Sequence, residues 1–140
     1  MSASATDFAR HAAKTALNYL LIALLCILLG AVYELFSHEV YSFWMIYAFV
    51  FPLAGGTLPF LLMLLRPRRW YPGAVGRKLY HSGIATLTVG SIMQGILEIY
   101  GTTNRLTRMY GYVGVPLLIA GIVLALIRPA SAGRSMRKRL

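Results

Sequence analysis

The residues best suited to chemistry are two carboxylates and a histidine close to the ends of long apolar stretches. Glu34 and Glu98 each lie near the end of such a stretch, and His38 comes one helical turn after Glu34. Carboxylate and imidazole groups near a membrane boundary can bind a divalent cation, a proton or a cationic solute. The sequence therefore predicts an ion- or solute-binding vestibule of Glu34, His38 and Glu98, with a metal ion as one occupant to test. The alternative is that each glutamate caps a loop or pairs with Arg105 or Arg108.

A ridge of small or polar residues leads from Glu98 back through the apolar stretch 79–100. Its members recur at every fourth position, where side chains are neighbours on a helix surface: Ser82, Thr86, Gly90, Gln94 and Glu98. Lipid offers the amide of Gln94 no partner, so we expect it to face protein or water. Two roles are open for Gln94: solute binding below the glutamates, or an interhelical hydrogen bond. In the first case the solute path would be lined by Ser82, Thr86 and Gly90, with Cys26 and Gly30 opposite.

The composition is that of a polytopic membrane protein. Of the 140 residues, 58% are hydrophobic and 13% are charged, and the mean hydropathy is +0.64. A net charge of +10 could suggest nucleic-acid binding. The Lys and Arg residues stand at the boundaries of apolar stretches, however, so membrane topology explains them and no nucleic-acid partner is expected.

The apolar pattern predicts an all-α fold, a transmembrane four-helix bundle. We expect membrane helices over 14–36, 43–65, 79–100 and 110–127. A polar lead-in (1–13), a basic loop (66–78) and a basic tail (128–140) complete the chain. Pro52 and Pro116 lie inside the second and fourth helices and are predicted hinges, because proline removes a helix hydrogen bond.

The two halves of the sequence resemble each other. Lys14 matches Lys78, Glu34 matches Glu98 and Pro52 matches Pro116, each 64 residues apart. Hydrophobic segments can match by chance, but these matches are charged residues and prolines. We therefore predict two tandem helical hairpins that form a parallel internal repeat, an arrangement found in transporters and in proteins without a transport role.

The charge distribution predicts an orientation. With the N-terminus inside, twelve of the fourteen Lys and Arg residues are cytoplasmic, and only Arg105 and Arg108 are outside. The positive-inside rule then places both termini in the cytoplasm and the chain in a plasma or inner membrane. The basic loop and tail could also hold anionic lipid headgroups, or they could serve topology alone.

The leading functional hypothesis is a small transporter- or channel-like membrane protein that binds a cation or small polar solute. The alternative is a non-catalytic membrane subunit that docks another membrane protein. Four helices make a thin bundle, so we expect a homo-oligomer or a membrane-protein partner. No hydrolase, HExxH or phosphate-loop motif is present, so no catalytic residue is predicted. No cofactor is expected, and haem is not favoured because His38 lies outside while His11 and His81 lie inside.

Overall fold

The computed structural model describes residues 2–65 and 73–127. This part of the chain is all-helical and contains no strand. The helices are α1 (Ser2–Phe36), α5 (Ala74–Ile99), α6 (Thr107–Ile127) and an interrupted helix of four pieces, α2 (Phe43–Ile46), α3 (Val50–Pro52), the π-helix η1 (Leu53–Thr57) and α4 (Leu58–Leu65). Most of the predicted basic loop and the whole basic tail lie outside the described residues.

Four helices are long and apolar enough to cross a membrane, as predicted. They are Ala9–Phe36, Phe43–Leu65, Ala74–Ile99 and Thr107–Ile127, with mean hydropathies between 1.2 and 2.3. α1 begins at Ser2 rather than at Lys14, so the lead-in is helical. Its alanines favour helix, and neither glycine nor proline interrupts it. The chain is therefore consistent with an integral membrane protein.

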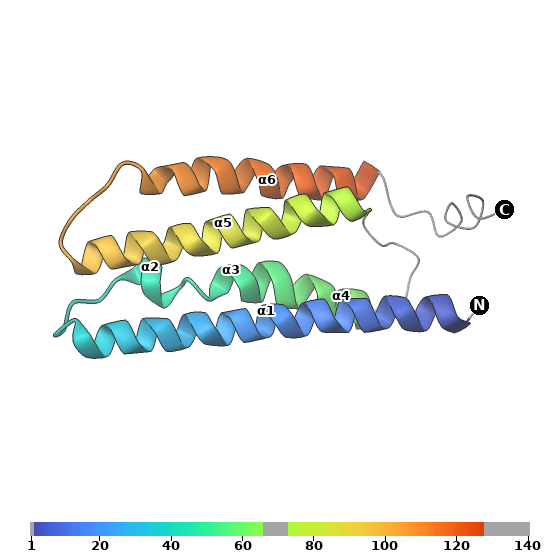
Figure 1. Ribbon diagram of the computed structural model, residues 1–140, viewed down its shortest axis with the longest axis horizontal. Helices are drawn as coiled ribbons and strands as arrows, with labels where there is room; N and C mark the ends of the chain where they lie inside the picture. Colours follow the sequence, from blue (N-terminus) through green and yellow to red (C-terminus); the bar gives the residue numbers. More distant parts are fainter. Residues whose placement is uncertain (1, 66–72, 128–140) are drawn as a thin grey trace.

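The helices lie side by side in chain order (Figure 1). α1 packs on the interrupted helix, α2 and α3 pack on α5, and α5 packs on α6. Within the described ranges the backbone of α6 does not come close to any helix of the first hairpin, and the two meet through side chains: Leu118 packs against a cluster that includes Tyr19 and Phe60. In their backbone contacts the helices therefore form an open row with α1 and α6 at its edges. Both hairpin turns lie at one end, here called the turn end, and the N-terminus lies at the other, the terminal end (Figure 1).

α5 and α6 are joined along a seam in which a large residue repeatedly meets a glycine. Along α5 the seam glycines are seven residues apart, which keeps them on one line facing an antiparallel partner. The close pairs are Gly76 with Ala125, Gly83 with Leu118, Gly90 with Tyr110, Leu87 with Gly114 and Tyr80 with Gly121. Small residues let helix backbones approach closely where lipid gives no hydrophobic driving force.

The interruption of the second helix follows from its prolines. Pro52 cannot donate to the carbonyl of Ala48, and the helix is broken by turns at 47–49 just before it. Pro59 likewise cannot donate to Gly55, and the hydroxyl of Tyr80 donates to that carbonyl. The irregularity expected around Pro52 is therefore present, whereas α6 continues as α-helix through Pro116. Hinge motion at either proline stays a prediction.

Candidate functional site

At the turn end, Glu98 ties α5 to the beginning of α2. The hydroxyl of Ser42, which is 1% exposed, donates to Oε2 of Glu98 at 2.6 Å. Glu34 is half-buried, while His38 is exposed in the first turn with a positive φ of 48°. Among the described residues, no three His, Cys, Asp or Glu side chains are grouped closely enough to hold a metal ion. This arrangement gives no support to a metal ion held by Glu34, His38 and Glu98 together, while binding of a proton or a cationic solute at the vestibule stays a prediction.

Removing the Ser42 hydroxyl is expected to destabilise the protein by about 1–2 kcal/mol, because a charged acceptor loses its donor. Glu98→Gln should cost less, since its amide oxygen still accepts this hydrogen bond. SDS titration in mixed micelles measures both losses, with exposed Glu39→Gln as the control.

The stability losses of Glu34→Gln and Glu98→Gln should be additive within about 0.5 kcal/mol if the two carboxylates act separately. A larger coupling energy would indicate that Glu34 and Glu98 share one site, as the predicted vestibule requires.

The members of the predicted ridge do not share one environment. Gly90 packs on Tyr110, and Oε1 of Gln94 accepts a hydrogen bond from the hydroxyl of Thr107, so both contribute to the α5–α6 seam. The hydroxyl of Thr86 donates to the carbonyl of Ser82, one turn earlier on the same helix, at 2.7 Å. Gln94 therefore makes an interhelical hydrogen bond, which is one of the two roles predicted for it.

Two further residues predicted to line the path belong to the first hairpin. Gly30 lies against Met45: a Cβ atom at this position would be 3.5 Å from the carbonyl oxygen of Met45. Cys26 is buried in α1. Gly30 therefore serves the contact between α1 and α2 and does not face the α5 ridge. Gly90 and Gln94 do line a hollow of about 400 Å³, which they share with Trp44, Thr107 and other residues.

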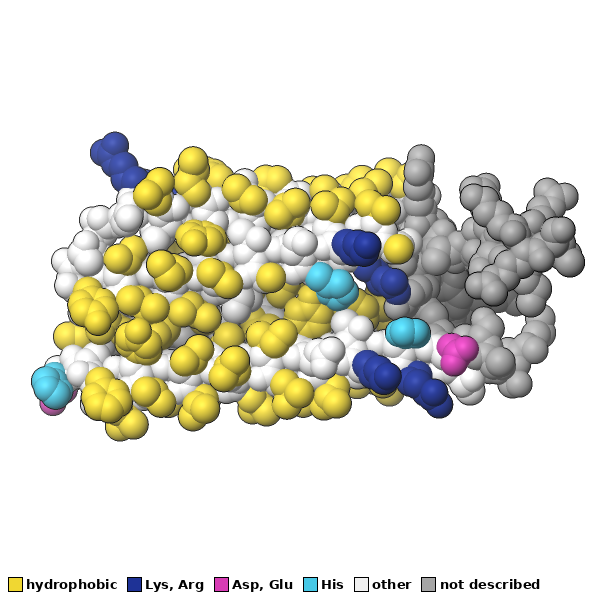
Figure 2. Space-filling view, viewed as in Figure 1, with side chains coloured by type: hydrophobic (Ala, Val, Ile, Leu, Met, Phe, Trp, Pro, Cys, Tyr) yellow, Lys and Arg dark blue, Asp and Glu magenta, His cyan; other side chains and the backbone are white. Residues whose placement is uncertain are grey.

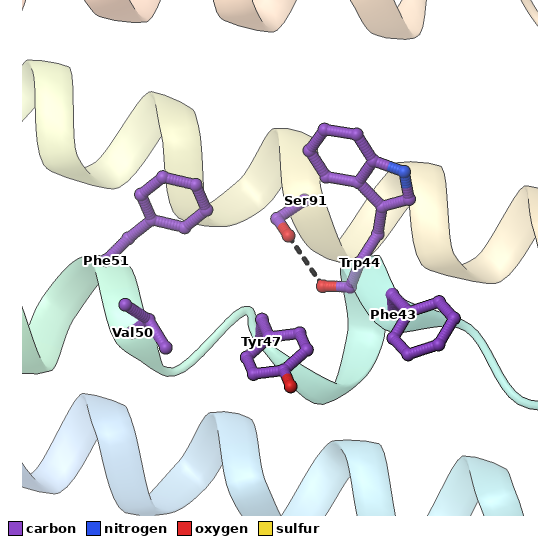
Figure 3. A pocket seen from close by; sticks show the side chains of 6 residues that line it. All are labelled: Phe43, Trp44, Tyr47, Val50, Phe51 and Ser91. Atoms are coloured by element: carbon purple, nitrogen blue, oxygen red, sulfur yellow. Dashed lines mark hydrogen bonds between the residues drawn. The ribbon is translucent and has the colours of Figure 1, made fainter.

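A second hollow, the aromatic pocket, lies at the break in the interrupted helix (Figure 3). It has a volume of about 390 Å³ and is lined by Phe43, Trp44, Tyr47, Val50, Phe51 and Ser91. The hydroxyl of Ser91 on α5 donates to the carbonyl of Trp44 at 2.6 Å and fixes α2 beside α5. Aromatic faces in such a pocket can hold an apolar group or attract a cation.

A third hollow, the α1–α5 groove, has a volume of about 450 Å³ and contains a hydrogen-bonded Tyr–His pair. The hydroxyl of Tyr19 and Nδ1 of His81 form the hydrogen bond that joins α1 to α5. Phe60 on α4 stacks on His81, with ring centroids 5.5 Å apart and planes 19° apart. An imidazole inside an apolar span is costly without partners, so this cluster supplies both a hydrogen bond and an aromatic enclosure.

The sequence placed His81 only on the inner side of the membrane and did not pair it with Tyr19. One signal pointed to it: His81 is an ionisable residue inside an apolar stretch, which by itself marks a residue that needs a partner. The partner could not be named, because it depends on how the two hairpins face each other.

No family model, curated protein or solved structure matches the chain. Its function must therefore be argued from the hollows and the helices that form them.

Proposed function

We propose that the protein is a small transporter- or channel-like membrane protein that binds a cation or small polar solute beside its interrupted helix. One observation carries the proposal: adjacent residues of the interrupted helix line two different hollows. Phe51 lines the aromatic pocket, and the next residue, Pro52, lines the α1–α5 groove. Discontinuous membrane helices form the solute sites of many transporters.

The two hairpins suit different mechanical roles in this proposal. The α5–α6 pair is closed along its length by glycine contacts, so it would act as a rigid support. The interrupted helix has a turn at 47–49 and a π-helix at Leu53–Thr57, so α2 and α3 could shift against that support. Such a shift, with Pro52 as the hinge, would open and close the aromatic pocket.

The solute class follows from the lining of the aromatic pocket. Trp44, Tyr47 and Phe51 offer ring faces, which favour an organic cation over an anion. Glu34 and Glu98 lie in the last turns of α1 and α5, at the turn end, and would raise the local concentration of cations there. In this version of the function the glutamates attract the solute, and the aromatic pocket binds it.

We also propose the orientation with both termini in the cytoplasm of a plasma or inner membrane, and an origin by duplication. Two observations support duplication. Each hairpin closes on glycines that meet a large partner, such as Gly56 on Tyr19 and Gly121 on Tyr80. The match between the halves also slips from 64 residues at Pro52 to 62 at Arg66, and the π-helix lies in that interval.

A second candidate function, a membrane subunit that docks another copy or another membrane protein, is favoured by the open row. The fourth span is the least buried of the four, at 17%, and the first is 22% buried, the same share as the second; the first and fourth form the two edges. Either edge could accept a further helix without rearrangement.

Binding of tetraphenylphosphonium to the purified protein in detergent tests the proposal. Trp44→Ala should weaken binding about tenfold, because a cation–π contact and apolar area are lost together. Phe36→Ala, which removes a ring that is 79% exposed outside the pocket, is the control. Uptake of tetraethylammonium, an organic cation that crosses lipid poorly by itself, into proteoliposomes should fall with Trp44→Ala. Equal binding by the wild type and Trp44→Ala would contradict the proposal, and a second protein at fixed stoichiometry without cation binding would favour the subunit.

A further inference from the structure

The α1–α5 groove has the form of a slot for a chain-like molecule. Its walls come from α1 and α5 and its floor includes Pro52 of α3. Most of its exposed surface is apolar, although half of its ten lining residues carry a polar group: Thr15, Asn18, Tyr19, His81 and Thr88. The hollow of about 450 Å³ lies between two helices that are long and apolar enough to span a membrane. Lipid in the membrane can therefore reach it.

Cationic side chains gather on both helices at the terminal end of the groove. Lys14 lies one turn before Asn18 on α1, and Lys78 lies one turn before His81 on α5, so each continues the wall of the groove. Figure 2 shows Lys, Arg and His side chains over both helices at this end, with one acidic side chain farther toward the terminal end, while hydrophobic side chains cover most of this face up to the turn end. Both lysines are exposed.

We propose that this groove binds one anionic phospholipid. The phosphate would lie between the ammonium groups of Lys14 and Lys78, and an acyl chain would follow Ile22, Ala85 and Val89 toward the middle of the span. Asn18 and the Tyr19–His81 pair lie between these two regions, at the level where ester oxygens need hydrogen-bond donors.

Charge and shape together select this occupant. Basic pockets between membrane helices on the cytoplasmic side bind anionic headgroups. A zwitterionic lipid also offers a phosphate, but its headgroup carries a cation as well and leaves the charge of the two lysines unbalanced. Free phosphate could satisfy the lysines but would leave the apolar slot unfilled. The site differs from the basic loop and tail of the sequence, and it does not depend on the solute proposed for the aromatic pocket.

Native mass spectrometry tests the site on protein released from vesicles of phosphatidylcholine and phosphatidylglycerol. The wild type should retain one phosphatidylglycerol. The double variant Lys14→Gln/Lys78→Gln should retain it about tenfold less, because two headgroup charges are removed. The matched control is Arg105→Gln/Arg108→Gln, which removes the same charge from exposed residues at the turn end. Equal losses in the two double variants would mean diffuse attraction and would overturn the proposal.

The acyl part of the site has its own test. Ala85 is exposed and lines the groove, so Ala85→Phe should fill it and lower retention about tenfold without removing a buried contact. Ala31→Phe, at an exposed position of α1 toward the turn end, should leave retention unchanged. Excess inorganic phosphate should not displace the lipid. Full retention in Ala85→Phe, or displacement by phosphate, would overturn the proposal.

Discussion

Gly121→Ala is expected to destabilise the protein by about 2–3 kcal/mol, the upper part of the usual range for overpacking. A Cβ atom at Gly121 would lie 2.5 Å from the backbone nitrogen and 2.8 Å from the Cα of Tyr80. Backbone atoms cannot rotate away as a side chain can, so α5 and α6 must separate. SDS titration in mixed micelles, followed by circular dichroism, measures the loss.

Gly111 provides the matched control on the same helix. A Cβ atom there meets nothing within 4 Å. Gly111→Ala should therefore raise stability by about 0.5–1 kcal/mol, because alanine favours helix over glycine. The two substitutions are chemically identical, so opposite signs isolate the seam contact. If Gly121→Ala proved as stable as Gly111→Ala, the α5–α6 seam described here would be wrong.

The same seam explains why the sequence predicted the helices better than the site. A membrane span is recorded in the length of an apolar run, which is a one-dimensional property, and the second span ends at Phe43 and Leu65 as predicted. A site depends on which helix faces meet. A ridge repeated every fourth residue drifts around the helix, because four residues exceed one turn.

The observed seam alternates steps of four and three residues, through Tyr80, Gly83, Leu87 and Gly90, and so runs straight along its partner. The predicted ridge and this seam share Gly90 and Gln94, and that is why these two contact α6. The ridge pattern alone could not distinguish a path from a helix contact. Nor could it show that the hairpins meet through Tyr19 and His81, which belong to no repeated pattern.

The second large effect is expected at Tyr19, where three helices meet. Its side chain is 8% exposed, its ring stacks on Phe60 at a centroid distance of 6.2 Å, and the backbone of Gly56 lies against it. Tyr19→Ala would leave a cavity and should cost about 3–5 kcal/mol. Tyr19→Phe keeps the ring and loses only the hydrogen bond to His81, so it should cost about 0.6 kcal/mol. Tyr100→Ala, at a side chain 74% exposed, should change stability by less than about 0.5 kcal/mol.

A compensating substitution makes the Tyr19 prediction specific. In the wild type, a Cβ atom at Gly56 would lie 2.1 Å from Cγ of Tyr19, so Gly56→Leu should be strongly destabilising. In the Tyr19→Ala background the same leucine can occupy the space left by the ring, and the double variant should recover at least about 2 kcal/mol relative to the sum of the single losses. Unfolding measured as for Gly121 gives the coupling directly. Additive losses would show that Tyr19 does not pack on Gly56, and the first hairpin would then need a different helix register.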